Sequence, residues 1–502
     1  MNIEPSRERF IELGSHQRVI GVHTRLLADH LTPIAIYQRL CGDRDLTFLL
    51  ESAESGVWSR WSFVGVRAAS TLLGKDDASV WLGPDIEGLT IDGEPLDVLA
   101  HVLDVLSTPD SLDATDPPPF SSGMVGYLGY DIVRRLEHLP DSNPDDLGVP
   151  DLVMMLASDL AIYDHKLGEV WLVANAINFD DSPDRVDDAY SDAIARVLAM
   201  AEALNQPSDP ALAWQDTSSV VPVTRQRSDA EFEGAVVSAV DEILAGEAFQ
   251  IVVSQRFDLP TDADALEIYR ELRTTNPSPY LYLLRLPGFS IIGSSPEALV
   301  TVNDGIATTH PIAGTRPRGS SPQLDLDLEH ELLADPKERA EHLMLVDLGR
   351  NDLGRVCEPG SIAVTEFMQV RRYSHVMHLE AAVTGRVSPG RSALDVTLAC
   401  FPAGTLSGAP KVRAMEIIDE LEVSRRGVYG GVVGYFDFAG NGDAAIAIRT
   451  ALLKDGIAHV QAGGGIVADS VPRLENAESQ NKAAAALNAV RRAEGLRTLG
   501  RP

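Results

Sequence analysis

A stretch without regular pattern at residues 205–228 divides the chain into two segments of about equal length. Its sequence, NQPSDPALAWQDTSSVVPVTRQRS, is rich in Pro, Ser and Thr and lacks helical periodicity, which is typical of a linker or a long surface crossing. We therefore predict an N-terminal half over residues 1–205, a linker over 206–228 and a C-terminal half over 229–502.

Both halves mix strand-like and helix-like patterns. In the N-terminal half, strand-like runs such as Ser158 to Tyr163 alternate with helix-like runs such as Arg185 to Leu204. In the C-terminal half, FQIVVSQRF and FSIIGSS read as strands, and we expect helices over Leu328 to Leu345 and Ala477 to Ala493. A regular βαβ rhythm is missing, so the sequence predicts an α+β fold rather than a doubly wound one.

The charge balance restricts the possible partners. The chain has 74 acidic and 42 basic residues, a formal net charge of −32. Such a charge argues against non-specific binding to nucleic acid or to an anionic membrane surface. We find no apolar run long enough for a transmembrane helix and no signal peptide, and three widely spaced cysteines fit a reducing cytoplasm.

Two carboxylate pairs are the first candidate for chemistry. Glu338 and Glu341 are three residues apart on a helical pattern, and Glu475 and Glu478 repeat that spacing, with Lys482 four residues further on. Side chains at this spacing share one helix face. The plain alternative is a solvated helix face. As ligands, oxygen atoms on two helices would suit Mg²⁺ and not zinc.

Other candidates interrupt apolar strand patterns. Three consecutive glycines, Gly463 to Gly465, form either a backbone nest for a carboxylate or a tight turn. Arg449 in AIAIRTA must pair with a carboxylate, either of a substrate or of an internal salt bridge. His378 is a structural histidine unless its context shows otherwise, and Glu297 at a strand end is either a buried general acid or a surface residue.

Taken together and in this order, the motifs resemble the chorismate-utilising enzymes, and within them the anthranilate-forming branch. The resemblance covers about Glu231 to Val490, and the N-terminal half matches more loosely through LLESA. It implies a two-domain α+β fold with β-sheets packed face to face and helices outside. The motifs are GSSPE, HPIAGTRPRG, EHLMLVDLGRNDLGRV, RYSHVMHL, FPAGTLSGAPKVRAMEII, YGGVVGY, AIAIRTA, QAGGGIVADS and the segment from Glu475 to Lys482.

The resemblance also implies an activity, the first step of tryptophan biosynthesis, in which chorismate and ammonia give anthranilate and pyruvate with the help of Mg²⁺. By similarity, Glu341 and Glu478 hold the metal ion. Glu338 and Glu475 support them.

The same resemblance assigns the catalytic and substrate-binding residues. Glu297 would protonate the departing C4 hydroxyl, and His378 would act in the elimination of pyruvate. The residues expected to bind chorismate are Gly314, Thr315, Tyr429, Arg449, Gly463, Gly464, Gly465 and Lys482.

Two positions discriminate within the family. Aminodeoxychorismate synthases typically carry a lysine nucleophile where this chain has Ala313, and isochorismate and salicylate synthases use a lysine where it has Gln250. A neutral amide cannot activate water as a base. Both absences favour ammonia as the nucleophile, and aminodeoxychorismate synthase remains the alternative enzyme.

The N-terminal half implies feedback inhibition by tryptophan. The residues that match the family's tryptophan pocket are Glu51, Ser52, Pro279, Tyr280 and Leu281. One departure is Glu380, which stands two residues from His378 where relatives usually have serine. We expect its side chain to face solvent. It motivates a third reading, a tryptophan-binding regulatory protein without catalysis.

The source of ammonia is expected in a second chain. None of Cys41, Cys357 and Cys400 lies in the glycine-flanked elbow that a glutaminase nucleophile needs. The resemblance implies a separate glutamine amidotransferase subunit in an α₂β₂ assembly.

Overall fold

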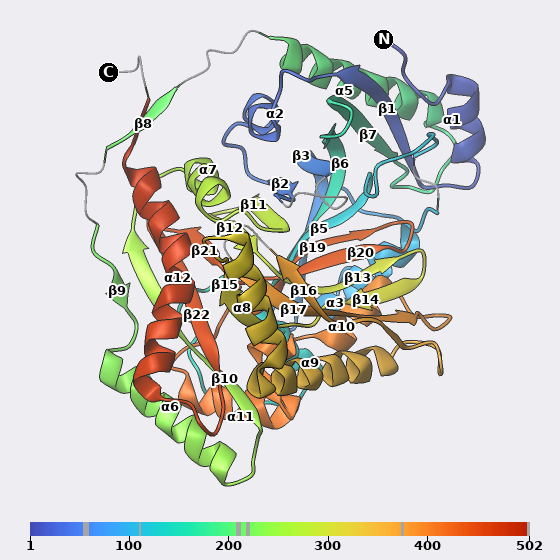
Figure 1. The fold of residues 1–502 in the computed structure, drawn as a ribbon. Helices are drawn as coiled ribbons and strands as arrows, with labels where there is room; N and C mark the ends of the chain where they lie inside the picture. Colours follow the sequence, from blue (N-terminus) through green and yellow to red (C-terminus); the bar gives the residue numbers. More distant parts are fainter. Residues whose placement is uncertain (54–59, 110–111, 207–211, 217–220, 373–375, 499–502) are drawn as a thin grey trace.

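The fold is seen in a computed structural model (Figure 1) that describes residues 1–53, 60–109, 112–206, 212–216, 221–372 and 376–498. Strand β6 (Leu152–Asp164) is buried along its whole length. Its sequence is a nearly continuous apolar run, as a strand covered on both faces requires. It pairs with β3 (Trp61–Lys75), β5 (Gly123–Leu128) and β7 (Glu169–Ile177), and β7 pairs with β1 (Val19–Leu27).

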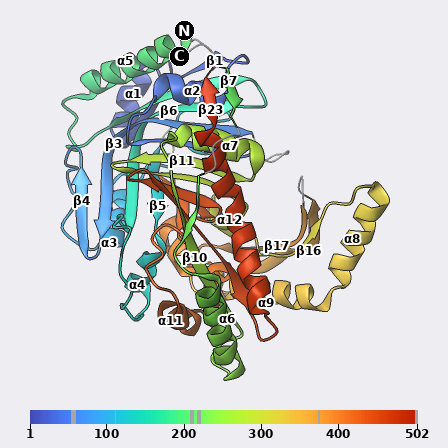
Figure 2. The same ribbon diagram turned by 90° about the vertical axis from the view of Figure 1, so that its left-hand side faces the viewer.

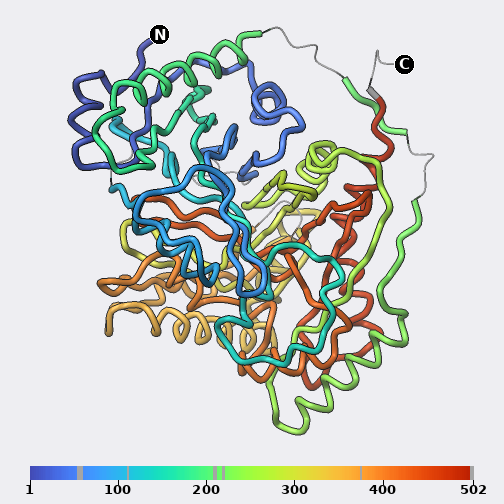
Figure 3. The backbone as a smooth tube through the Cα atoms, turned by 180° about the vertical axis from the view of Figure 1, so that it is seen from behind, coloured from blue at the N-terminus to red at the C-terminus, as the bar shows by residue number. Residues whose placement is uncertain are grey.

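Strands from the two halves alternate in the sheets. β2 (Thr47–Glu51) pairs with β11 (Tyr280–Leu286), and β5 pairs with β19 (Val432–Asp437). In Figure 3 the N-terminal part of the tube runs between segments of the C-terminal half. Residues 1–205 and 229–502 therefore complete one another's sheets by backbone hydrogen bonds.

Two curved sheets meet at β3 and β6. The first runs through β10 (Gln250–Pro260), β22 (Ile457–Ile466), β21 (Thr450–Lys454), β12 (Phe289–Ser295), β11 and β2. The second runs through β16 (Ala363–Arg372), β17 (Val376–Arg386), β14 (Ile306–Thr309), β13 (Ala298–Asn303), β20 (Gly442–Ile446), β19 and β5, and β15 (Ile312–Pro317) also pairs with β17.

One hydrophobic core lies between these sheets. It joins Phe48 on β2, Tyr282 on β11 and Leu452 on β21 to Val125 on β5 and Val433 on β19. The α+β prediction, with sheets packed face to face, is confirmed.

The residues between the halves add short edge strands, since β8 (Ala213–Gln215) pairs with β23 (Leu496–Thr498) and β9 (Thr224–Arg225) pairs with β10. Residues 207–211 and 217–220 of the predicted linker lie outside the described ranges.

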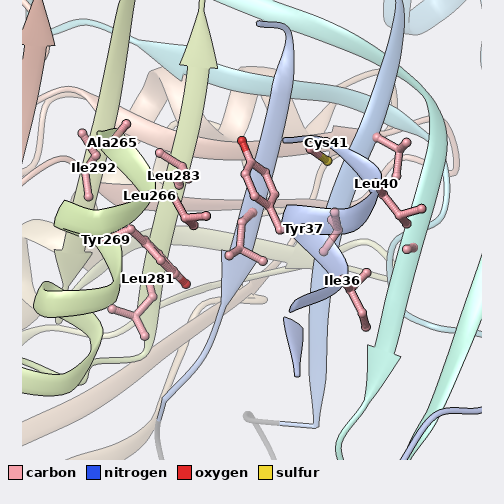
Figure 4. Packing of buried hydrophobic residues seen from close by; sticks show 14 of the residues in the cluster. Ile36, Tyr37, Leu40, Cys41, Ala265, Leu266, Tyr269, Leu281, Leu283 and Ile292 are labelled. Atoms are coloured by element: carbon pink, nitrogen blue, oxygen red, sulfur yellow. The ribbon is translucent and has the colours of Figure 1, made fainter. Parts of the chain in front are cut away.

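Helices cover the outer faces, as predicted. Against β10 and β22 lie α6 (Asp229–Leu244), α11 (Lys411–Leu421) and α12 (Pro472–Glu494), and α7 (Ala265–Thr275) packs on α12. Near β1 and β7 lie α1 (Arg7–Gly14) and α5 (Val186–Asn205). α2 (Pro33–Leu40) packs on β3 and α5, and α3 (Pro95–Val105) packs on β3 and β4 (Ala78–Leu82). A second core joins α2 to α7, β11 and β12 across the two halves (Figure 4).

The predicted helix over Leu328 to Leu345 is wrong in one respect, because it is two helices. α8 (Pro322–Ala334) ends before Asp335, and α9 (Pro336–Gly354) begins at the next residue. Proline lacks the N–H that a helix interior needs but suits a first helical position. Figure 2 shows α8 extending away from the body of the molecule. α10 (Ala393–Cys400) packs on α9. Among the described helices, none has the length and apolar character needed to cross a membrane.

Candidate active site

Each glutamate pair lies near the start of a long helix, with Glu338 and Glu475 in the first turns of α9 and α12. Asp335 caps α9 by accepting hydrogen bonds from the backbone N–H of Lys337 (2.9 Å) and Glu338 (3.3 Å). Acidic residues at a helix N-terminus are favoured by the helix dipole. Glu475 occupies the corresponding turn of α12, which begins at Pro472. The expectation that each pair shares one helix face is therefore met by α-helices at both positions.

The structure also brings the two pairs together. Burial is the main cause that raises the pKa of Glu341, and the charge of Glu338 is the second. The charge of Glu478 on the other helix raises it further. Burial and the charge of Glu478 likewise raise the pKa of Glu475. Three basic side chains lie near these carboxylates. Lys482 Nζ lies 2.8 Å from Oε1 of Glu478, Arg316 Nη1 lies 3.4 Å from Oε1 of Glu338, and the charge of Lys337 opposes the rise in the pKa of Glu341 and Glu475. They only partly neutralise the region that the four carboxylates share, since the pKa values of Glu341 and Glu475 are still raised.

This donor set fits Mg²⁺. Mg²⁺ in proteins is commonly held by one or two carboxylates, with waters and an anionic substrate completing its octahedral shell. In the part of the chain that the structure describes, no three His, Cys, Asp or Glu side chains are grouped as a finished metal cage. A site of two carboxylates, one from α9 and one from α12, needs no such cage.

The glycine run lies beside these glutamates on strand β22. A side chain at Gly464 would bring its Cβ 3.2 Å from Oε2 of Glu475 and 3.5 Å from Oε1 of Glu478. All three glycines pair in register with β10, so the run is extended strand and the expected tight turn is wrong. β22 pairs with β21 only as far as Val460 among the described residues, which leaves this glycine edge facing the site.

Arg449 and Tyr429 form an adjacent wall. Arg449 has a φ of 52°, a conformation that costs a non-glycine residue about 1–3 kcal/mol and that clusters at functional sites. Its Nη1 donates to the carbonyl of Lys482 (3.2 Å), and within the described ranges it forms no ion pair, so the alternative of an internal salt bridge is wrong. Burial raises the pKa of Tyr429 to about 12, and its hydroxyl accepts from the N–H of Gly463.

Glu297 lies between β12 and β13, where its backbone carbonyl accepts a hydrogen bond from Ile446 N (2.9 Å). Its carboxylate accepts from Thr405 Oγ1 (3.1 Å). Burial raises the pKa of Glu297 to about 7, although the charge of Lys482 opposes this shift. A carboxyl group with such a pKa can hold a proton near neutrality and release it to a substrate, so the surface alternative is wrong.

His378 faces Thr315 across the β15–β17 pair. Its Nδ1 lies 2.9 Å from the carbonyl oxygen of Gly314 and 3.1 Å from Thr315 Oγ1. A carbonyl oxygen only accepts, so Nδ1 carries the proton and the lone pair lies on Nε2. Burial lowers the pKa of His378, which favours the neutral, basic form. Gly314 has a φ of 66° in the bulge that aims its carbonyl at this ring.

The expectation that Glu380 faces solvent is wrong. Its side chain is 13% exposed, and its carboxylate lies 3.4 Å from His310 Nδ1 and 3.9 Å from Arg371 Nε. Residues two apart on a strand share one face, so Glu380 lies on the same face of β17 as His378. Its negative charge opposes the lowering of the pKa of His378.

Comparisons with known proteins agree with this geometry. Residues 47–488 match the chorismate binding enzyme family. The chain belongs to this family. Anthranilate synthase component 1 of Mycolicibacterium smegmatis is 56% identical over 98% of this chain and 94% of its own length, and that of Arthrobacter globiformis is 50% identical over 99% and 95%.

Solved structures give the same answer for the fold. Anthranilate synthase component I of Streptococcus pneumoniae TIGR4 superposes with a TM-score of 0.75 at 36% identity, covering 92% of this chain and 98% of that one. The menaquinone-specific isochorismate synthase of Escherichia coli has a TM-score of 0.69 at 17% identity, covering 97% and 99%, and shows the fold alone. Within the chorismate-binding enzymes, this chain falls among the anthranilate synthase component 1 relatives.

A second group of the predicted residues of this chorismate-binding enzyme lies where β2 pairs with β11. Glu51 pairs in register with Leu281. Its carboxylate accepts hydrogen bonds from Tyr269 Oη (2.5 Å) and Arg273 Nε (3.0 Å). The hydroxyl of Ser52 is buried and has no hydrogen-bond partner among the described residues. The predicted tryptophan residues near 51 and 280 therefore do lie together.

Sequence reasoning missed several residues around these two groups. Tyr269 and Arg273 share one face of α7 at a spacing of four, which is a detectable signal, but their partner Glu51 is far away in sequence. Thr405 in the FPAGT motif was assigned no role, and nothing local shows that its hydroxyl reaches Glu297.

Removing one charge from the glutamate region should stabilise the metal-free enzyme. Glu341→Gln relieves burial and repulsion of a carboxylate, so we expect its thermal midpoint in EDTA to rise by roughly 1–3 °C. Differential scanning calorimetry measures this. The control Glu202→Gln, at an exposed position of α5, should leave the midpoint unchanged. A fall in the midpoint of Glu341→Gln would mean that this carboxylate is held by favourable contacts.

Proposed function

We propose that this chain is the synthase subunit that converts chorismate and ammonia to anthranilate and pyruvate, a Mg²⁺-dependent carbon–oxygen lyase reaction at the first step of tryptophan biosynthesis in the cytoplasm. The observation that carries the proposal is the meeting of α9 and α12, which places the glutamates beside Arg449 and the glycine edge of β22. The identity to anthranilate synthase component 1 proteins supports it over nearly the whole chain.

Chorismate has two carboxylates, and the site offers a place for each. Glu341 and Glu478 would hold Mg²⁺, with Glu338 and Glu475 as supporting carboxylates. The ion would bind the ring carboxylate and neutralise its charge. Arg449 and Tyr429 would bind the enolpyruvyl carboxylate, together with the backbone of residues 463–465. A guanidinium without an internal ion pair is suited to this role, because it can form two parallel hydrogen bonds with a carboxylate.

The reaction needs an acid and then a base. Glu297 would give its proton to the C4 hydroxyl, which leaves as water while ammonia attacks C2. His378, neutral and with its lone pair on Nε2, would then remove the C2 proton as the enolpyruvyl group leaves and becomes pyruvate. Gly314 and Thr315 fix the ring of His378 in this orientation. Burial thus suits each residue to its role, because it raises the pKa of Glu297, which can then hold a proton, and lowers the pKa of His378, which then stays a neutral base.

Ammonia would come from a glutamine amidotransferase partner in an α₂β₂ assembly. The three cysteines of this chain are all buried. Burial raises the pKa of Cys41 to about 12 and also raises the pKa values of Cys357 and Cys400. A buried thiol with a raised pKa is a poor nucleophile, which supports a second subunit as the glutaminase.

The direct test is product formation by the isolated chain with chorismate, Mg²⁺ and ammonium. We expect anthranilate fluorescence that EDTA abolishes and tryptophan suppresses. Formation of a 4-amino product would instead indicate aminodeoxychorismate synthase. If the chain binds tryptophan but forms no product at any ammonium concentration, it is a tryptophan-binding regulatory protein without catalysis.

The reaction should require the protonated form of Glu297. Because its pKa lies at about 7 and the acid form acts, kcat/KM for chorismate should fall as pH rises through about 7. The measurement is made at constant free ammonia, since ammonia itself titrates with pH. Glu297→Gln should lose about 10²-fold or more in kcat/KM and should lack this descending limb. A variant that kept the limb would contradict the assignment.

Ser52 should contribute to tryptophan binding. Its buried hydroxyl without a partner is suited to bind a polar group of the inhibitor. Ser52→Ala should raise the tryptophan concentration for half inhibition by about two- to tenfold, the loss expected for one hydrogen bond. Inhibition curves of Ser191→Ala, an exposed serine on α5, serve as the control. Unchanged inhibition of Ser52→Ala would place the inhibitor elsewhere.

A further inference from the structure

Arg316 is the basic side chain that links the glutamate region to helix α8. It lies on β15 next to Thr315, and its side chain is 17% exposed. Its Nε donates to Glu331 of α8 (2.8 Å), and its Nη2 donates to Asp335, the residue that caps α9 (2.8 Å). These two short charge-assisted hydrogen bonds go to different elements, so they hold the guanidinium in one orientation.

The remaining nitrogen of this guanidinium reaches the proposed site. Nη1 donates to the backbone carbonyl of Thr315 (3.0 Å) and to Oε1 of Glu338 (3.4 Å). The carboxylate of Glu338 also packs on Gly314, where an added Cβ would lie 3.2 Å from Oε2. Glu338 is therefore held between Arg316 and the glycine whose carbonyl orients His378.

The second ion pair of the glutamate region differs from this one. Lys482 contacts Glu478, which is proposed to bind the ion itself, whereas Arg316 contacts Glu338, which is proposed only to support it. The side chains of Lys482 and Glu478 are 37% and 50% exposed, and those of Arg316 and Glu338 are 17% and 22% exposed. Water therefore screens the charge of Arg316 less.

The charge of the site decides how well it binds each of its two proposed ligands. Mg²⁺ adds two positive charges, and chorismate adds two carboxylates. A more negative site attracts the ion more strongly and repels the substrate more strongly. One fixed positive charge beside the glutamates therefore lowers the affinity for the ion and raises the affinity for the substrate. An arginine supplies this charge at any working pH, because its guanidinium does not lose its proton.

We propose that Arg316 is a positioning residue that holds Glu338 in its supporting place and balances its charge, so that the site accepts a dianionic substrate together with a divalent ion. The proposal rests on the proposed function, which supplies the ion and the substrate. In this role Arg316 touches neither ligand and acts through Glu338. The proposal also gives α8 a function, because Glu331 of that helix fixes the guanidinium at its Nε.

The first test is the affinity of the full-length chain for Mn²⁺ without substrate, measured from the electron paramagnetic resonance signal of the free ion. Arg316→Gln removes the positive charge and keeps a polar side chain, so it should bind Mn²⁺ about three- to tenfold more tightly. Arg316→Lys keeps the charge and should stay within about twofold of the wild type. Unchanged affinity of Arg316→Gln, or weaker affinity at a wild-type thermal midpoint, would overturn the proposal.

The substrate should respond in the opposite direction. At saturating Mg²⁺, the KM of Arg316→Gln for chorismate should rise about three- to tenfold, and that of Arg316→Lys should stay within about twofold of the wild type. A role in stability alone would not move the two affinities in opposite directions. A KM that falls together with the dissociation constant of Mn²⁺ would contradict the proposed charge balance.

Arg318→Gln is the matched control. Arg318 also pairs with an acidic residue of α8, since its Nη2 lies 2.9 Å from Oδ2 of Asp325. The variant loses the same charge and an anchor of the same helix, yet this ion pair involves none of the four glutamates. Both constants should therefore stay within about twofold of the wild type. If Arg318→Gln changed them as Arg316→Gln does, the contact with Glu338 would not be the cause, and the proposal would fall.

A crystal structure of the wild-type chain soaked with Mn²⁺ gives a test that needs no variant to fold. Nη1 of Arg316 should stay within about 4 Å of the Glu338 carboxylate while the ion is bound. A Glu338 carboxylate that leaves Arg316 and binds the ion directly would overturn the proposal. Absence of anthranilate from the wild-type chain would instead refute the proposed function, and the Mn²⁺ titration, which needs no turnover, separates the two failures.

Discussion

The backbone hydrogen bonds between the halves are the constraint on which the rest of the structure depends. β2 supplies the partner that β11 needs, and β5 supplies the partner of β19. An unpaired buried strand edge would leave a row of unsatisfied N–H and C=O groups. Since β11 carries Leu281 and β2 carries Glu51, the same pairing builds the proposed tryptophan pocket and links it rigidly to the sheet that leads through β12 into Glu297.

At the other end of the sheets, four glutamate side chains lie close together, which is electrostatically unfavourable. α9 and α12 each begin at a proline and each present a glutamate pair to the same region. Glu341 and Glu475 have raised pKa values there, because burial and neighbouring carboxylates disfavour their ionised forms. Such repulsion lowers stability without a cation and is a common feature of sites built for binding. The core between the sheets and the extensive strand pairing hold these helices in place against it.

Local sequence pattern was enough for many of the elements and for the faces of helices. The spacing of Glu338 and Glu341 identified one helix face, and α5 begins and ends close to its predicted residues. It failed where the answer depends on distant segments. Gly463 to Gly465 form a strand because β10 pairs with them. The side chain of Glu380 is largely buried because its carboxylate contacts His310, which lies between β14 and β15. The hydroxyl of Thr405 reaches Glu297 across 108 positions of sequence, which no local pattern encodes.

The central claim is that one metal ion and chorismate meet between α9 and α12. Crystals of Glu297→Gln, in which turnover is slowed, can be soaked with chorismate and Mn²⁺ in place of Mg²⁺, and anomalous scattering then locates the ion. The account predicts a peak between the carboxylates of Glu341 and Glu478, with chorismate extending toward Arg449. Bound chorismate with the peak elsewhere, or with no peak between these helices, would contradict it.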